Sequence, residues 1–128
     1  MRHISKLLAW AGIILILATG LIHFIDTPGV LKEMPYKGVL FALNGFGAMV
    51  SAVGIGRGSR SWGWMLGVLV AGGALLGYIA SRTIGMPGLP AEPDAWLEPL
   101  GVASMVVEAS FLVLAFRVLS APRFVPRS

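Results

Sequence analysis

Cysteine is absent from the sequence, and histidine occurs only twice. The first absence excludes disulfide bonds, thiolate nucleophiles and zinc or iron–sulfur centres with cysteine ligands. The scarcity of histidine leaves a metal site to be built mainly from carboxylates. No motif in the chain identifies a cofactor, so the cofactor stays unknown at this stage.

Charge is also scarce. Only 12% of the 128 residues are charged and 56% are hydrophobic, whereas a soluble domain carries about a quarter charged residues. The apolar residues form long blocks, which is typical of a chain whose solvent is lipid. The basic residues that give the net charge of +4 do not cluster, so we expect no nucleic-acid partner. The chain is predicted to be a single membrane domain over residues 1–128.

Four apolar blocks are long enough to cross a bilayer. At about 1.5 Å per residue each spans about 27–32 Å, the thickness of the hydrocarbon core. Backbone groups in lipid must bond within their own segment, so the sequence predicts an all-α protein, a four-transmembrane-helix bundle. A signal peptide ending near Ala18 to Gly20 is the alternative for the first block, but its apolar run continues through Ile25. The predicted spans are Leu7 to Ile25, Gly38 to Gly56, Ser61 to Ser81 and about 97–117.

Lysine and arginine are distributed unevenly between the two sides of these spans. Of the ten basic residues, Lys32, Lys37 and Arg82 lie beside the first and third connections, together with five acidic residues. The other seven flank the two termini and the second connection, where no acidic residue occurs. The positive-inside rule then places both termini in the cytoplasm. We expect a multi-pass protein of a prokaryotic plasma membrane. These seven are Arg2, Lys6, Arg57, Arg60, Arg117, Arg123 and Arg127.

Small residues recur at intervals of four in the second and third spans. This spacing lets helix backbones approach closely, and we expect the second and third spans to pack together through it. A homodimer or a partner membrane subunit is the alternative, because the third span has two such series. Leucine at Gly67 or Gly77 is predicted to disrupt packing. The series are Gly63, Gly67, Ala71; Gly73, Gly77, Ser81; and Ala48, Ala52, Gly56.

Polar residues inside the spans recur at helical spacing and at matching depths. Such residues usually face the interior of a bundle. If their faces converge, they form a polar pocket that opens to the outside and ends at Glu108, about 16 Å from the outer end of its helix. The predicted ligand- or proton-binding residues are Glu108, Asn44, Ser104, Thr19 and Tyr78, with His23, Glu98 and Arg82 at the outer rim.

Glu108 is the least expected of these residues, because a carboxyl group in a membrane span is costly. It is either neutral and hydrogen-bonded to Asn44 or Ser104, or ionised and paired with Arg82 or Lys37. A glutamine would hold helices together without this cost, which favours a functional role for ionisation. His23, Asp26 and Glu98 are weak candidates for a metal site, since imidazole and carboxylates are common ligands; the alternative is a His23 ring bonded to a carbonyl group.

Three functions remain open. The first is a pocket protein that binds a small ligand, cation or proton, with transport as an extension of that role. The second is an accessory or structural subunit of a larger membrane complex. An enzyme acting on lipid-like substrates ranks last, because no catalytic residues pair at fixed spacing and none is predicted. The small multidrug resistance transporters differ from this chain, since their membrane glutamate belongs to the first helix and Leu7 to Ile25 has no acidic residue.

Overall fold

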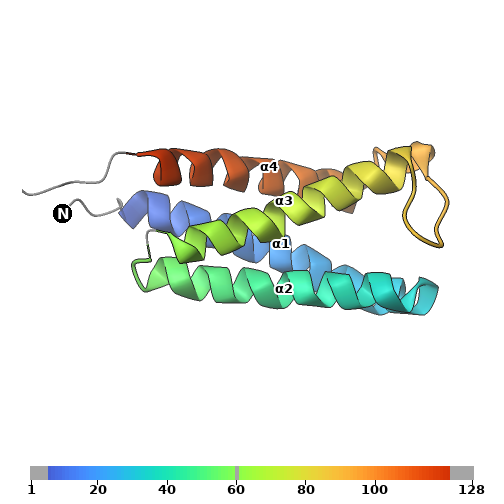
Figure 1. Cartoon of the computed structure of the whole chain (residues 1–128), viewed down its shortest axis with the longest axis horizontal. Helices are drawn as coiled ribbons and strands as arrows, with labels where there is room; N and C mark the ends of the chain where they lie inside the picture. Colours follow the sequence, from blue (N-terminus) through green and yellow to red (C-terminus); the bar gives the residue numbers. More distant parts are fainter. Residues whose placement is uncertain (1–5, 60, 122–128) are drawn as a thin grey trace, which may run out of the picture.

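The computed structural model describes residues 6–59 and 61–121, and it is built from helices (Figure 1). The four long helices are α1 (Lys6–Glu33), α2 (Pro35–Gly56), α3 (Trp62–Thr83) and α4 (Pro99–Ser120), with a short 3₁₀ helix η1 (Pro93–Ala95) before α4. All four are long and apolar enough to cross a membrane. The prediction of an all-helical bundle is confirmed, and the four apolar helices agree with a multi-pass membrane protein. Arg2, Arg60, Arg123 and Arg127, on which the orientation partly rests, lie outside the described residues.

α1 is longer than predicted. The helix continues past Ile25 through Asp26, Thr27 and Pro28 and ends at Glu33. Pro28 cannot donate the usual backbone hydrogen bond to the residue four positions earlier, yet one missing bond does not end a helix that neighbouring helices hold in place. As a result α2 begins almost at once, with Met34 as the junction and Pro35 in the first turn, where a missing N–H has no cost.

The four helices run alternately up and down, so each packs antiparallel to the next (Figure 1). We call the end formed by residues 84–98 and the Met34 junction the loop end. The opposite end, which holds the turn that follows α2, the start of α1 at Lys6 and the end of α4 at Ser120, is the terminal end. α2 and α3 lie close together near the terminal end and diverge toward the loop end (Figure 1).

The terminal half of the bundle is tightly packed between α2 and α3. A Cβ atom added at Gly63 would lie 2.8 Å from the Ile55 nitrogen and 2.9 Å from the Gly54 carbonyl carbon, so the two helices touch backbone to backbone. The buried Ser51 hydroxyl donates to the Gly63 carbonyl oxygen at 2.7 Å. Most of the buried apolar core of the protein lies in this half.

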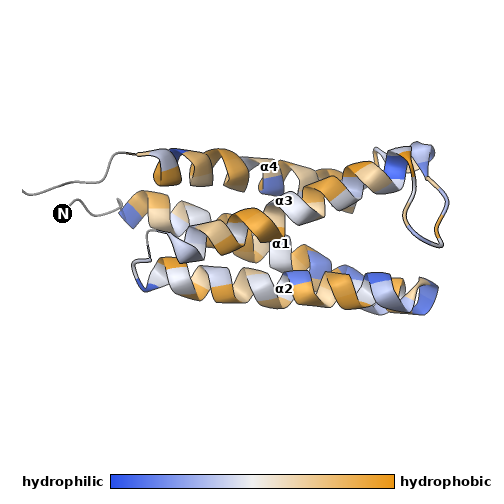
Figure 2. Cartoon of the chain, viewed as in Figure 1, coloured by the Kyte–Doolittle hydropathy of each residue, from blue (hydrophilic) through white to orange (hydrophobic). Residues whose placement is uncertain are grey.

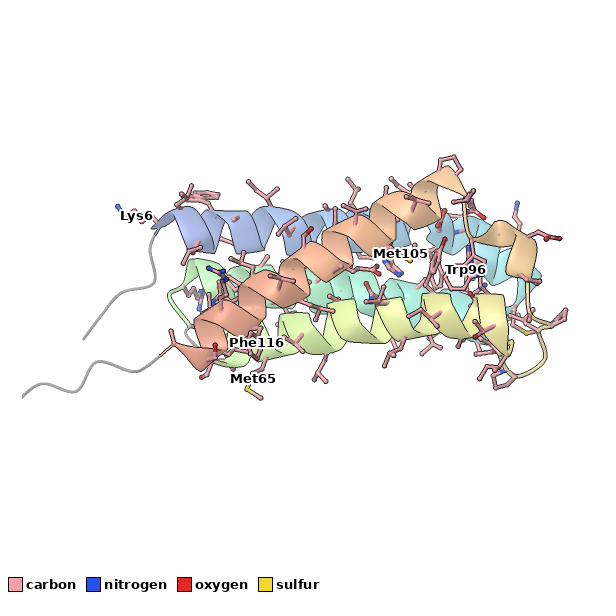
Figure 3. The ribbon with its side chains drawn as sticks, turned by 90° about the horizontal axis from the view of Figure 1, so that it is seen from above. Lys6, Met65, Trp96, Met105 and Phe116 are labelled. Atoms are coloured by element: carbon pink, nitrogen blue, oxygen red, sulfur yellow. The ribbon has the colours of Figure 1, made fainter. Side chains whose placement is uncertain are left out.

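Aromatic side chains join α4 to the same core. The Trp64 and Phe111 rings stack with centroids 5.6 Å apart, and neither residue is exposed. The Phe111 ring also fills the space beside Gly67, where a Cβ atom would clash with it. Met65 and Phe116 lie near the terminal end (Figure 3), and both are mostly exposed, at 57% and 72%.

The series Ala48, Ala52, Gly56 does not face α3 as expected. A Cβ atom at Gly20 of α1 would lie 2.7 Å from the Ala48 Cβ, so this face of α2 packs against α1. The face of α2 that meets α3 is instead Gly47, Ser51 and Gly54. Both faces of α2 carry small residues at helical spacing, and only the arrangement of the helices decides which partner each one meets.

The two small-residue series of α3 also differ from each other. Gly63, Gly67 and Ala71 are buried against α2 and α4. A Cβ atom at Gly73 or Gly77 would meet no atom within 4 Å. The prediction that leucine at Gly77 disrupts packing is therefore wrong within this chain, whereas that for Gly67 agrees with the crowding by Phe111.

Candidate functional site

A cavity of about 710 Å³ occupies the loop half of the bundle. The cavity exists because α2 and α3 diverge on the loop side of Val70 (Figure 1). At Val70 the two helices are in contact. The Asn44 side-chain amide donates to the Val70 carbonyl oxygen at 2.9 Å, and Gly47 lies against the Val70 side chain. Asn44, Val70 and Ser104 form the floor, and all four long helices contribute walls.

Polar side chains converge on this cavity from every helix. Figure 2 shows hydrophilic segments gathered at the loop end, while apolar segments dominate the middle of the bundle. Four of the lining residues are carboxylates and two are basic. The polar lining residues are His23, Asp26, Glu33, Lys37, Asn44, Tyr78, Ser81, Arg82, Glu92, Glu98 and Ser104.

Arg82 is the better anchored of the two basic residues. Its guanidinium group lies 3.8 Å from the centroid of the Tyr78 ring and 3.9 Å from a carboxylate oxygen of Glu98. It also donates to the Ser81 hydroxyl at 2.7 Å and to the Ala95 carbonyl oxygen at 3.4 Å. Each of its three nitrogen atoms thus has a partner, and these contacts hold Arg82 in place at the side of the cavity.

Tyr78 supports the same wall. Its hydroxyl donates to the Trp96 carbonyl oxygen at 2.7 Å, and the Tyr78 and Trp96 rings meet edge to face. A Cβ atom at Gly101 would lie 2.6 Å from the Tyr78 ring, so only glycine fits there. Figure 3 shows Trp96 at the loop end, beside the beginning of α4.

The loop of residues 84–92 covers the end of the cavity. Its chain crosses from the end of α3 toward the α1–α2 junction (Figure 1). The Tyr36 hydroxyl donates to the Pro87 carbonyl oxygen, and Gly88, whose φ of 76° suits glycine, lies close to the Met34 side chain. The Glu92 N–H donates to the Ser81 carbonyl oxygen at 2.9 Å. Met86 and Glu92 thereby become part of the cavity lining.

Most of the predicted site residues lie around this cavity. Asn44, Ser104 and Tyr78 line it together with the predicted rim residues His23, Arg82 and Glu98, and with Asp26. Thr19 and Glu108 do not line it. Thr19 is fully buried, and its hydroxyl donates to the Leu15 carbonyl oxygen of its own helix at 3.1 Å.

Glu108 lies one helical turn beyond Ser104. The Ser104 hydroxyl donates to Oε2 of Glu108, and Glu108 is only 1% exposed. Its other oxygen, Oε1, has no hydrogen-bond partner among the described residues. The ion pair with Arg82 or Lys37 is not formed, since Arg82 bonds Glu98 and the Lys37 ammonium lies 5.8 Å from the Phe41 ring. The carboxyl group is therefore connected to the cavity only through Ser104.

His23 is held by its own helix. Its Nδ1 lies 2.9 Å from the Thr19 carbonyl oxygen, and because a carbonyl oxygen only accepts, Nδ1 carries the proton. The ring packs against Phe41 with centroids 4.9 Å apart. Within residues 6–59 and 61–121, no three His, Asp or Glu side chains are close enough to hold a metal ion. The His23, Asp26 and Glu98 candidates thus do not form a cluster.

Two carboxylates of the cavity are not found by reasoning from the sequence. Glu33 lies on the same helical face as His23 and Asp26, at spacings that fit one side of a helix. This spacing is visible in the sequence, but the predicted span ends at Ile25, which places Glu33 in a loop. Glu92 comes from the irregular segment before α4, where no periodicity indicates which way a side chain points.

Comparison of the chain with protein-family models, with curated proteins and with solved structures gave no match.

Proposed function

We propose that this chain is a multi-pass membrane protein that binds a small cationic ligand in the cavity at its loop end. The observation that carries the proposal is the convergence of four carboxylates and two basic residues on one cavity of about 710 Å³. Cavities of about 300–1,000 Å³ with a few convergent polar groups are typical of small-molecule sites. Both termini face the cytoplasm in this proposal, so the loop end lies on the outer side.

The charge balance favours a cation. Asp26, Glu33 and Glu92 have no ion-pair partner among the described residues, and Glu98 shares only one long contact with Arg82. An ammonium group placed between these oxygens would replace its lost hydration with charge-assisted hydrogen bonds.

Binding is tested with defined cations on the purified full chain in lipid nanodiscs. Sodium, potassium, magnesium, calcium and a series of primary alkylammonium ions are titrated, and the change in thermal unfolding temperature is measured. We expect at least one of them to stabilise the protein. Asp26→Asn should weaken that binding about tenfold, because each removed charge contact is worth about 1.4 kcal/mol or more.

Asp94→Asn is the matched control, since Asp94 is exposed in η1 and does not line the cavity. No stabilisation by any of these cations would contradict the proposed function. Equal losses in Asp26→Asn and Asp94→Asn would show that the cavity is not the binding site. Uptake of a bound probe into proteoliposomes then tests whether the protein also transports it.

The orientation is tested with single cysteines, which the chain allows because it has none of its own. Asp94→Cys at the loop end and Ser120→Cys at the terminal end are both at exposed positions. A membrane-impermeant maleimide added to intact cells should label Asp94→Cys, and should label Ser120→Cys only after lysis. The reverse pattern would place the cavity on the cytoplasmic side.

A further inference from the structure

The cavity is covered along the bundle axis and open at its side. At the loop end, the contacts of Tyr36 with Pro87 and of Gly88 with Met34 hold the covering loop in place. On the loop side of Val70, the described residues of α2 and α3 form no hydrogen bond with each other. The cavity is bordered there by Leu40, Leu43 and Leu69, whose side chains are 50%, 59% and 72% exposed. In a membrane these exposed leucines face the hydrocarbon core.

The side opening runs along α3. A Cβ atom at Gly73 or Gly77 would meet no atom within 4 Å, and both glycines line the cavity. The opening ends at the floor, where Gly47 contacts Val70. From Gly77 to Val70 the helix rises about 10 Å. The cavity thus has a charged part at the loop end and an apolar side opening between α2 and α3. We call this opening, bordered by Leu40, Leu43, Leu69, Gly73 and Gly77, the slit.

We infer that the ligand is an amphiphile with a cationic head group and an alkyl chain, and that it enters from the bilayer through the slit between α2 and α3. This inference rests on the proposed function and names its ligand class. The head group lies at the loop end of the cavity, where the carboxylates are, and the chain lies along Gly73 and Gly77. The shape of the cavity selects such a molecule, because a small hydrated ion would leave the apolar slit unfilled.

The test compares a short and a long amine. Ethylammonium presents the head group alone, and octylammonium adds a chain that matches the slit. Both are titrated into the protein in phosphatidylcholine nanodiscs, with tryptophan fluorescence as the readout because Trp96 contacts the lining residue Tyr78. Partition into lipid raises the apparent affinity of octylammonium in any variant, so the decisive comparison is between variants and not between ligands.

Gly77→Leu fills the slit, and Gly56→Leu makes the same change on an exposed part of α2 outside the cavity. Both positions have room for a side chain, so both variants should fold, which thermal unfolding checks. We expect Gly77→Leu to weaken octylammonium binding at least about tenfold, since a few buried methylene groups account for that much. Ethylammonium binding should change less than about twofold in either variant.

Each other outcome overturns a defined part of the proposal. Equal octylammonium affinity in Gly77→Leu and Gly56→Leu, with ethylammonium still bound, would show that the alkyl chain does not lie in the slit. The proposed cation site would stand. If the wild type binds neither amine and does not respond to metal ions, the proposed function itself is contradicted. A second membrane chain that co-purifies with the wild type and is released by Gly77→Leu means that a partner helix fills the slit, and the chain is then an accessory subunit.

Discussion

The two halves of this bundle use the same residue type for opposite purposes. In the terminal half Gly63 lets α3 touch the backbone of α2, because a Cβ atom added there would lie only 2.8 Å from the Ile55 nitrogen. In the loop half Gly73 and Gly77 have open space beside them, and their missing side chains open the cavity wall. A small-residue series therefore indicates that a helix surface is smooth. Whether another helix covers that surface depends on where the helices diverge.

The two halves also differ in the surroundings of their polar side chains. In the terminal half Ser51 donates to the Gly63 carbonyl oxygen and ties two helices together. In the loop half, polar side chains of all four long helices line one cavity. Ser51 of the terminal half thus stabilises the fold, whereas the proposed function assigns the carboxylates of the loop half to a ligand. The following changes separate these two roles, from the largest expected effect to the smallest.

Gly63→Leu should have the largest effect. Its side chain would meet backbone atoms of Ile55 and Gly54, which cannot move aside as a flexible side chain can. Overpacking of this kind costs about 3 kcal/mol or more of the free energy of unfolding, measured by denaturant titration in detergent micelles. Gly77→Leu is the control and should change that free energy by less than about 0.5 kcal/mol, because Gly77 has open space and leucine favours helix. Equal losses in the two variants would refute the difference between the halves.

Phe111→Ala should lower the free energy of unfolding by about 3 kcal/mol, the usual cost of removing a buried aromatic ring. Phe111 is fully buried and stacks on Trp64, so its loss leaves a void in the terminal half. Phe116→Ala is the matched control on the same helix, since Phe116 is 72% exposed. The same denaturant titration compares them, and a larger loss from Phe116→Ala would reverse the assignment of the core face of α4.

Ser51→Ala should cost about 1 kcal/mol, the usual net contribution of one hydrogen bond. The substitution removes the donor to the Gly63 carbonyl oxygen in the most closely packed part of the bundle. Ser110→Ala, at an exposed position of α4, should leave the unfolding midpoint unchanged. An unchanged midpoint in Ser51→Ala would mean that helix contact alone holds α2 to α3.

Glu108→Gln should have the smallest effect on stability, within about 1 kcal/mol of wild type or more stable, because an ionised carboxylate in a membrane without a cation beside it is costly. No basic side chain bonds Glu108 among the described residues, and the amide oxygen of glutamine can still accept from Ser104. A loss above about 2 kcal/mol in the same titration would show that Glu108 is ionised and paired. Reduced cation binding with unchanged stability would place Glu108 within the functional site.

Particular residues show how much of the site can be predicted from the sequence. His23, Asn44, Tyr78, Arg82 and Ser104 share polarity at helical spacing, and the cavity brings them together. Thr19 satisfies the same rule, but its hydroxyl bonds its own helix, as a threonine can without any partner. Spacing indicates the face of a helix, and it does not tell whether a polar group on that face is already satisfied.

The sequence alone determined that this chain forms four helices long and apolar enough to cross a membrane. Blocks of apolar residues of bilayer length leave no other way to satisfy backbone hydrogen bonds. Only the tertiary structure decided which small residues touch, because α2 presents one such face to α1 and another to α3. It also decided that Glu108 lies beyond the cavity and that the slit beside Gly77 is open. These features depend on the angle at which α3 leaves α2, which arises from packing between segments distant in sequence and is not encoded by any one of them.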